Sequence, residues 1–86
     1  MYQVTWSLSA SKDVRKLPAR YATKILRKVE ALGTNPFPTG SKKMQGHKDL
    51  YRLRQGDYRV IYQVRQKQLV IVVVEVGNRG EIYRGY

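Results

Sequence analysis

The sequence has no cysteine and only one histidine, His47, among its 86 residues. Without cysteine the chain forms neither a disulfide framework nor a thiolate metal site, and a single histidine excludes a histidine cluster. No apolar run approaches the roughly 20 residues of a membrane-spanning helix, and the N-terminus lacks the charged and then apolar pattern of a secretory signal. We therefore expect one cytoplasmic domain, residues 1–86, that holds together by packing alone and needs no metal or cofactor.

Acidic residues are also scarce. Six Asp and Glu stand against 17 Lys and Arg, which leaves a net charge of +11 at pH 7. Such a surplus of positive charge is typical of proteins that bind polyanions. A nucleic acid or a very acidic protein is therefore the expected partner.

The N-terminal part of the chain carries the pattern of one strand and two helices. Residues 1–8 alternate apolar and polar side chains, which predicts a half-buried strand. Ser9 is the expected cap of a short helix. Pro18 suits the first turn of a second helix, which ends at Gly33. The two helices form a hairpin whose apolar stripe packs on a sheet: Ala10, Val14, Leu17, Ala22, Ile25, Leu26, Val29 and Leu32.

A loop without clear periodicity follows, over residues 35–48. Loops of this length are uncommon in compact domains and are often functional, although a lysine-rich loop is also often simply solvated. We expect His47 to have no catalytic role. The lysines of this loop are expected to bind phosphate groups without specificity: Lys42, Lys43 and Lys48.

Residues 50–83 predict three antiparallel strands joined by two short turns. Residues 69–74 are continuously apolar, as in a central strand that is covered on both faces. The helix hairpin covers one face, and we expect a partner or a folded-back terminus on the other. The predicted fold is therefore α+β: an N-terminal strand, a two-helix hairpin and a three-stranded antiparallel meander, which together form a four-stranded sheet.

A two-residue turn at residues 55–56 sets the register of the first two strands of this meander. It pairs Arg54 with Asp57. Arg52 then lies opposite Arg59, and all three arginines share one face of the sheet. Their mutual repulsion is relieved if an anion binds between them, although a solvated strand face is the simpler explanation. The opposite, core-directed face carries Tyr51, Leu53, Tyr58, Val60, Tyr62 and Val64.

Two runs in this region, LYRLRQGDYRVIYQV (residues 50–64) and VEVGNRGEIYR (residues 74–84), are specific in combination. They resemble the RelE/ParE superfamily of toxin–antitoxin toxins, and its RelE branch most closely, with a similarity that spans essentially the whole chain. The resemblance implies a ribosome-dependent endoribonuclease that cleaves mRNA in the decoding site, whereas ParE relatives inhibit DNA gyrase. It also implies a cognate RelB-like antitoxin that holds the toxin inactive in a hetero-oligomer, with the ribosome and mRNA as further partners.

The resemblance also implies roles for single residues. Arg59 matches the arginine that clamps the scissile phosphate, and Arg79 matches the arginine after the Val-Gly pair. Tyr83 matches a tyrosine that stacks on a base and assists proton transfer. Arg52 and Arg54 stand where the best-known member has lysines, and because a guanidinium is effectively never deprotonated, they stabilise charge rather than act as a base. The implied site comprises catalytic Arg54, Arg59, Arg79 and Tyr83, and RNA-binding Lys42, Lys43, Lys48, Arg52 and Arg84.

Cleavage of RNA by its own 2′-hydroxyl fits these side chains. The reaction needs an aligned nucleophile, positive charge on the developing phosphorane and a proton carrier, and none of these requires a metal. Tyr83 is the expected base or stacking platform, with a core or edge aromatic as the alternative. Two other functions stay open: a gyrase inhibitor, which needs none of these side chains for catalysis, and a catalytically inactive nucleic-acid-binding module.

Overall fold

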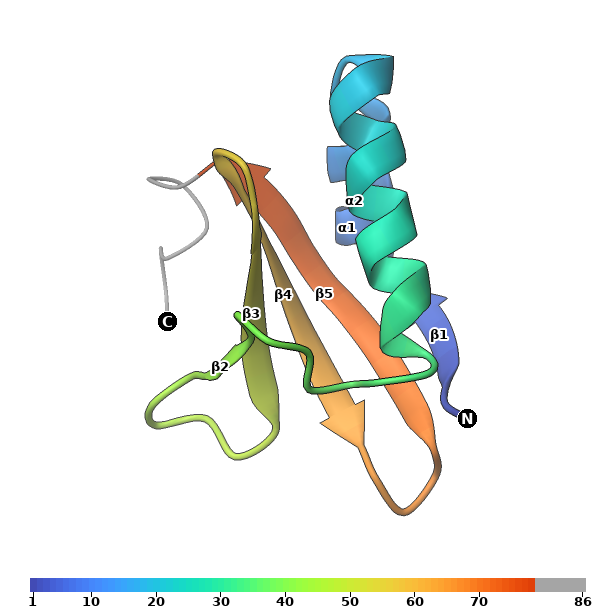
Figure 1. Ribbon diagram of the computed structural model, residues 1–86, viewed down its shortest axis with the longest axis vertical. Helices are drawn as coiled ribbons and strands as arrows, with labels where there is room; N and C mark the ends of the chain where they lie inside the picture. Colours follow the sequence, from blue (N-terminus) through green and yellow to red (C-terminus); the bar gives the residue numbers. More distant parts are fainter. Residues whose placement is uncertain (79–86) are drawn as a thin grey trace.

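A computed structural model of the chain describes residues 1–78. Figure 1 shows two layers, a twisted sheet and a pair of helices that pack on one of its faces. The elements in chain order are β1 (Gln3–Trp6), α1 (Leu8–Arg15), α2 (Ala19–Leu32), β2 (Lys42–Lys43), β3 (Leu50–Gln55), β4 (Tyr58–Arg65) and β5 (Val70–Asn78). Within the described residues, no helix is long and apolar enough to span a membrane.

The sheet has five strands in the order β1-β5-β4-β3-β2. β1 runs parallel to β5, and the other neighbouring strands are antiparallel. The predicted α+β fold is confirmed, but the predicted four-stranded sheet is wrong by one strand. The additional strand is β2, which pairs with β3 inside the segment predicted as a loop. Two residues are too few to show the alternation that predicts a strand.

The N-terminal elements differ from their predicted bounds by a few residues. Ser7, rather than Ser9, caps α1, because its side-chain oxygen accepts a hydrogen bond of 3.0 Å from the backbone N–H of Ala10. Pro18 lies one position before the first turn of α2, as its N-cap, with φ −55° and ψ 144°. Gly33 ends α2 as predicted. The chain therefore leaves β1 and enters α1 within a single residue.

The core lies between the helices and the sheet. The predicted core-directed face of β3 and β4 is confirmed, since Leu53, Val60, Tyr62 and Val64 are buried there, and Tyr51 and Tyr58 pack against them. The fully buried Tyr62 donates a hydrogen bond of 2.8 Å from its hydroxyl to the carbonyl oxygen of Pro36. This bond holds the segment after α2 against the sheet, and that segment leads directly into β2.

The turn between β3 and β4 lies at Gly56 and Asp57, not at residues 55–56. Gly56 has φ +59°, and the glycine stands first in this two-residue turn, as type II′ hairpins prefer. The prediction placed the glycine second, which shifts the pairing by two residues. Because side chains alternate with a period of two, the error changes the cross-strand partners but leaves every side chain on its predicted face.

Candidate functional site

One face of the sheet carries two like-charged cross-strand pairs. Arg54 on β3 lies directly opposite Arg59 on β4. Lys42 on β2 lies directly opposite Arg52 on β3. The predicted pairing of Arg52 with Arg59 is wrong, since Arg52 lies opposite Ile61. The repulsion that it implied is nevertheless present, because each of the two observed pairs brings like charges together. We call the surface formed by Lys42, Arg52, Arg54 and Arg59 the basic face.

The four side chains of the basic face line a pocket of about 260 Å³, together with Gly40. Gly40 has φ +95°, a conformation that favours glycine, and it lies just before β2. The described part of the lining contains no carboxylate. Because guanidinium groups donate paired hydrogen bonds to the oxygens of phosphates, the pocket suits a phosphate group.

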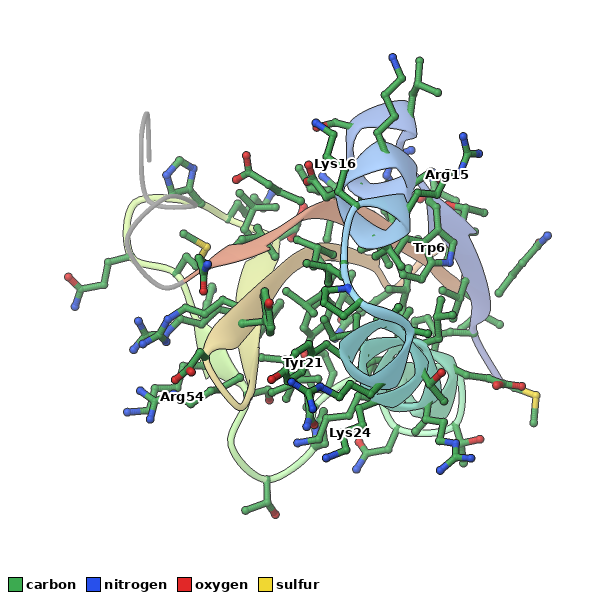
Figure 2. The ribbon with its side chains drawn as sticks, turned by 90° about the horizontal axis from the view of Figure 1, so that it is seen from above. Trp6, Arg15, Lys16, Tyr21, Lys24 and Arg54 are labelled. Carbon is green, nitrogen blue, oxygen red and sulfur yellow. The ribbon has the colours of Figure 1, made fainter. Side chains whose placement is uncertain are left out.

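The cations of the basic face lie at different depths. Arg59 is buried, with only 6% of its surface exposed, whereas Arg52 is half-buried and Arg54 and Lys42 are exposed. Figure 2 shows Arg54 reaching away from the two helices. A buried guanidinium stays charged, and its attraction for an anion is stronger in the protein interior than in water. Arg59 therefore forms the floor of the pocket, and Arg54 and Lys42 form its rim.

Residues 4–83 match the family model of the ParE toxin of type II toxin–antitoxin systems, parDE. The chain belongs to this toxin family. The toxin is 38% identical to a putative RelE-like toxin protein of Escherichia coli over 80 residues, which cover 91% of this chain and 83% of that protein. It is 30% identical to the mRNA interferase toxin RelE of Escherichia coli strain K12 over 86 residues, which cover 95% of this chain and 90% of that one.

The fold of the toxin is also that of solved relatives. It superposes on the toxin in an archaeal RelE–RelB complex from Pyrococcus horikoshii OT3 with a TM-score of 0.82 and 34% identity, covering 93% of this chain and 97% of that chain. Together with the curated relatives, this likeness places the toxin in the RelE/ParE superfamily and in its RelE-like branch, as its sequence pattern predicted.

The three predicted lysines of this RelE-like toxin do not form one site. Lys42 belongs to the basic face. Lys43 lies opposite Tyr51, so its side chain is on the other face of the sheet. Together with Lys48, it lines a separate pocket of about 670 Å³. A phosphate bound between Arg54 and Arg59 is thus within reach of Lys42 alone among the three lysines.

Three of the predicted site residues, Arg79, Tyr83 and Arg84, lie outside the described residues. Their roles therefore stay predictions. Arg79 comes two positions after Gly77 in the chain, and Gly77 lies opposite Arg59.

Sequence reasoning missed two residues of β5 that share the basic face. Glu75 lies opposite Ile61, and Gly77 lies opposite Arg59. Among the residues of the described strands, Glu75 is the single one with a carboxylate side chain. Counting by twos from the buried Ile71 predicts a core position for Glu75, where a carboxylate is costly. That conflict was the available signal that β5 is irregular.

The described lining of the pocket defines what chemistry it supports. It supplies positive charge and hydrogen-bond donors, but its described side chains include no carboxylate, imidazole or phenol. The toxin can therefore hold a phosphate there and stabilise negative charge that develops on it. A proton carrier has to come from another part of the chain or from its partner.

Proposed function

We propose that this toxin inhibits translation as a ribosome-dependent endoribonuclease that cleaves mRNA in the decoding site. The observation that carries the proposal is the pocket where four cations from three strands converge on one space. Attack of a 2′-hydroxyl on the neighbouring phosphorus adds negative charge to the phosphate oxygens, and such a pocket stabilises that charge. The relative in Escherichia coli strain K12 that is named mRNA interferase toxin RelE supports this assignment.

In the proposed reaction, Arg59 and Arg54 hold the scissile phosphate from adjacent strands. Removal of one preorganised donor of this kind typically lowers the rate by roughly 10²- to 10³-fold. Arg52 and Lys42 bind phosphate oxygens of the same RNA strand and fix its position. No metal takes part in the proposed reaction.

Proton transfer is the step that the basic face does not provide. We assign it to Tyr83, with Arg79 as a further phosphate ligand, on the strength of the family resemblance. Tyr83 would take the proton from the 2′-hydroxyl as the new P–O bond forms and pass it to the leaving 5′-oxygen as the P–O bond to that oxygen breaks.

A RelB-like antitoxin is the proposed protein partner. The relative from Pyrococcus horikoshii forms a RelE–RelB complex. An acidic or amphipathic antitoxin segment over the basic face would neutralise exposed Arg54 and Lys42 and exclude RNA. Co-purification of the toxin with the product of a neighbouring gene tests this partner, and addition of that protein should stop cleavage.

Purified toxin, ribosomes and a defined mRNA test the proposed activity. Toeprinting should reveal new mRNA ends in the decoding site with the natural toxin. Arg54→Ala should lower the cleavage rate by about 10²-fold. Arg15→Ala is the matched control, because it removes the same exposed charge from α1, which Figure 2 shows on the opposite side of the molecule from Arg54. Full activity of both Arg54→Ala and Arg59→Ala would overturn the proposed mechanism.

Gyrase inhibition is a second candidate function, because the matching family model is that of the ParE toxin. A supercoiling assay with purified gyrase separates the two. A gyrase inhibitor should block supercoiling and leave mRNA on the ribosome intact, and the cleavage chemistry proposed for Arg54 and Arg59 would then not apply.

A further inference from the structure

We propose that Ser7 and Asp13 are positioning residues for the basic face. They hold a β-bulge in β5 whose effect is to place Glu75 and Gly77, rather than a valine, on that face. The catalytic part of this proposal rests on the proposed RNA cleavage, whereas the structural part can be tested without it.

The bulge is visible in the pairing of β4 with β5. Tyr62 lies opposite Val73, and the preceding residue, Ile61, lies opposite Glu75. Val74 is therefore an extra residue on β5 without a partner on β4. A bulge of this kind reverses the alternation of all the side chains that follow it.

A regular ladder without the bulge would place different residues of β5 in the core and on the basic face. In an uninterrupted ladder that continued from Tyr62–Val73, Glu75 would lie opposite Val60 and would point into the core. Val76 would lie opposite Arg59, where its methyl groups would fill space on the basic face. With the bulge, Val76 is buried in the core and Gly77 lies opposite Arg59. A glycine leaves room there for a guanidinium and its ligand.

Side chains from the N-cap and the last turn of α1 satisfy the backbone of the bulge. β1 ends opposite Val73, so among residues 1–78 no strand lies beside the edge of β5 beyond that point. The Ser7 hydroxyl donates a hydrogen bond of 2.8 Å to the carbonyl oxygen of Val74. The backbone N–H of Val76 donates one of 3.2 Å to a carboxylate oxygen of Asp13. One bond is to the extra residue itself and the other is to the residue two positions after it, so they hold the irregular register and disfavour the regular one.

α1 and its cap residue thus contact β5 at the point where the register between β4 and β5 changes. Figure 1 shows α1 on the helix side of the sheet, directly after β1, and it packs against β5. Ser7 also caps α1 through Ala10, so one hydroxyl group contacts both the first turn of the helix and the bulge of β5. Neither Ser7 nor Asp13 lines the pocket, and in this arrangement they act on it through β5.

Two pairs of substitutions separate positioning from simple stabilisation. Ser7→Thr and Ser7→Asp both keep an oxygen that caps α1, but only threonine keeps a hydrogen to donate to Val74. Asp13→Asn keeps an acceptor for the N–H of Val76, whereas Asp13→Leu has none. In the ribosome assay we expect Ser7→Asp and Asp13→Leu to lower kcat by about 10- to 100-fold with KM little changed, as displacement of a site by about 1 Å does. Ser7→Thr and Asp13→Asn should stay near the wild-type kcat.

An NMR measurement on the free toxin tests the same idea without RNA. Cross-strand NOEs between the backbone protons of Ile61 and Glu75 should be present in the wild type and in Ser7→Thr, and weakened in Ser7→Asp and Asp13→Leu. If the wild type does not cleave mRNA, the proposed function fails while these NOEs still decide whether Ser7 and Asp13 hold the bulge. If the wild type cleaves and the folded Ser7→Asp and Asp13→Leu variants keep full kcat, the positioning role is wrong.

Deletion of Val74 provides a second test, which can be used if those variants do not fold. It makes the pairs Ile61–Glu75 and Tyr62–Val73 consecutive on both strands, so the basic face keeps its residues without a bulge. In that background Ser7→Asp should cause no further loss of kcat. An equal loss with and without Val74 would mean that Ser7 does not act through the bulge, and its positioning role would be wrong.

Discussion

Arg54 and Arg59 face each other across β3 and β4, one exposed and one buried, with no side chain between them in the ladder. Like charges in this arrangement destabilise a sheet, and the toxin keeps them at the pocket that we propose for phosphate. Binding capacity and stability therefore oppose each other at this pair, which is a property of preorganised sites.

Replacement of Arg54 should separate the two effects. Arg54→Gln is expected to raise the free energy of unfolding by about 0.2–1 kcal/mol at low salt, because it removes the repulsion from Arg59. The same variant should cleave mRNA more slowly. Urea unfolding at low and high ionic strength, beside the ribosome assay, measures both. Arg15→Gln on α1 is the control for cleavage and should leave the rate unchanged; a destabilised Arg54→Gln would contradict the proposed repulsion.

Lys42 and Lys43 are sequence neighbours on opposite faces of the sheet, so equal charge removal should have unequal effects. Lys42→Ala is expected to slow single-turnover cleavage by about 5-fold, which corresponds to the roughly 1 kcal/mol of attraction between charges 4 Å apart in water. Lys43→Ala should weaken ribosome binding at most, without slowing cleavage at saturating ribosomes. Equal rates for the two variants would show that Lys42 does not act in the pocket.

The Tyr62 hydroxyl links the core to the segment that precedes β2. Burial raises the pKa of this phenol above its ordinary value of 10.0, against the smaller, opposite effect of a hydrogen bond with Ser41. The neutral phenol is therefore favoured in the folded state, and the stability that this contributes is fully present below about pH 10, the pKa in the unfolded chain. It is lost as the pH rises from there toward the folded-state pKa.

Comparison with Tyr62→Phe isolates this contribution. The variant should be less stable at pH 8 by about 1–3 kcal/mol, because it leaves the Pro36 carbonyl oxygen without the phenol donor. Above pH 10 its stability should fall less steeply than that of the wild type. Urea unfolding at pH 8, 10 and 11 measures the difference, and parallel curves for the two proteins would exclude ionisation of Tyr62 as the cause.

Much of this architecture could be predicted because it follows from alternation over several residues. The pattern from Tyr51 to Val64 assigned the core face of β3 and β4 correctly, and the same count put Arg52, Arg54 and Arg59 on the other face. The predicted faces are correct although the predicted turn position is wrong, because the pairing shifts by two residues and side chains alternate with a period of two. The predicted cross-strand partners are wrong, since they depend on which position of the turn Gly56 takes.

Other features left too little trace in the sequence. β2 has two residues, which is too short for any period, so the pairing of Lys42 with Arg52 was missed. The bulge at Val74 lies at the end of the apolar run of residues 69–74, and no polar side chain within that run marks the change of face. Only Glu75 indicated the bulge, because counting by twos from Ile71 puts its carboxylate in the core. Such irregularities depend on contacts with α1 that are distant in sequence.

Gly77 provides the most direct test of why β5 is irregular. Valine is a better strand residue than glycine, so Gly77→Val should keep the stability of the toxin or raise it by about 0.5–1 kcal/mol. Its methyl groups would lie opposite Arg59 and restrict the guanidinium, so cleavage should fall by about 10²-fold, as for loss of one preorganised donor. Asn78→Val is the control, because this side chain lies opposite Tyr58 on the other face of the sheet. Thermal unfolding and the ribosome assay measure both effects. A stable Gly77→Val variant with normal cleavage would mean that the space opposite Arg59 is not needed, and the bulge would then serve only to bury Val76 and to keep Glu75 out of the core.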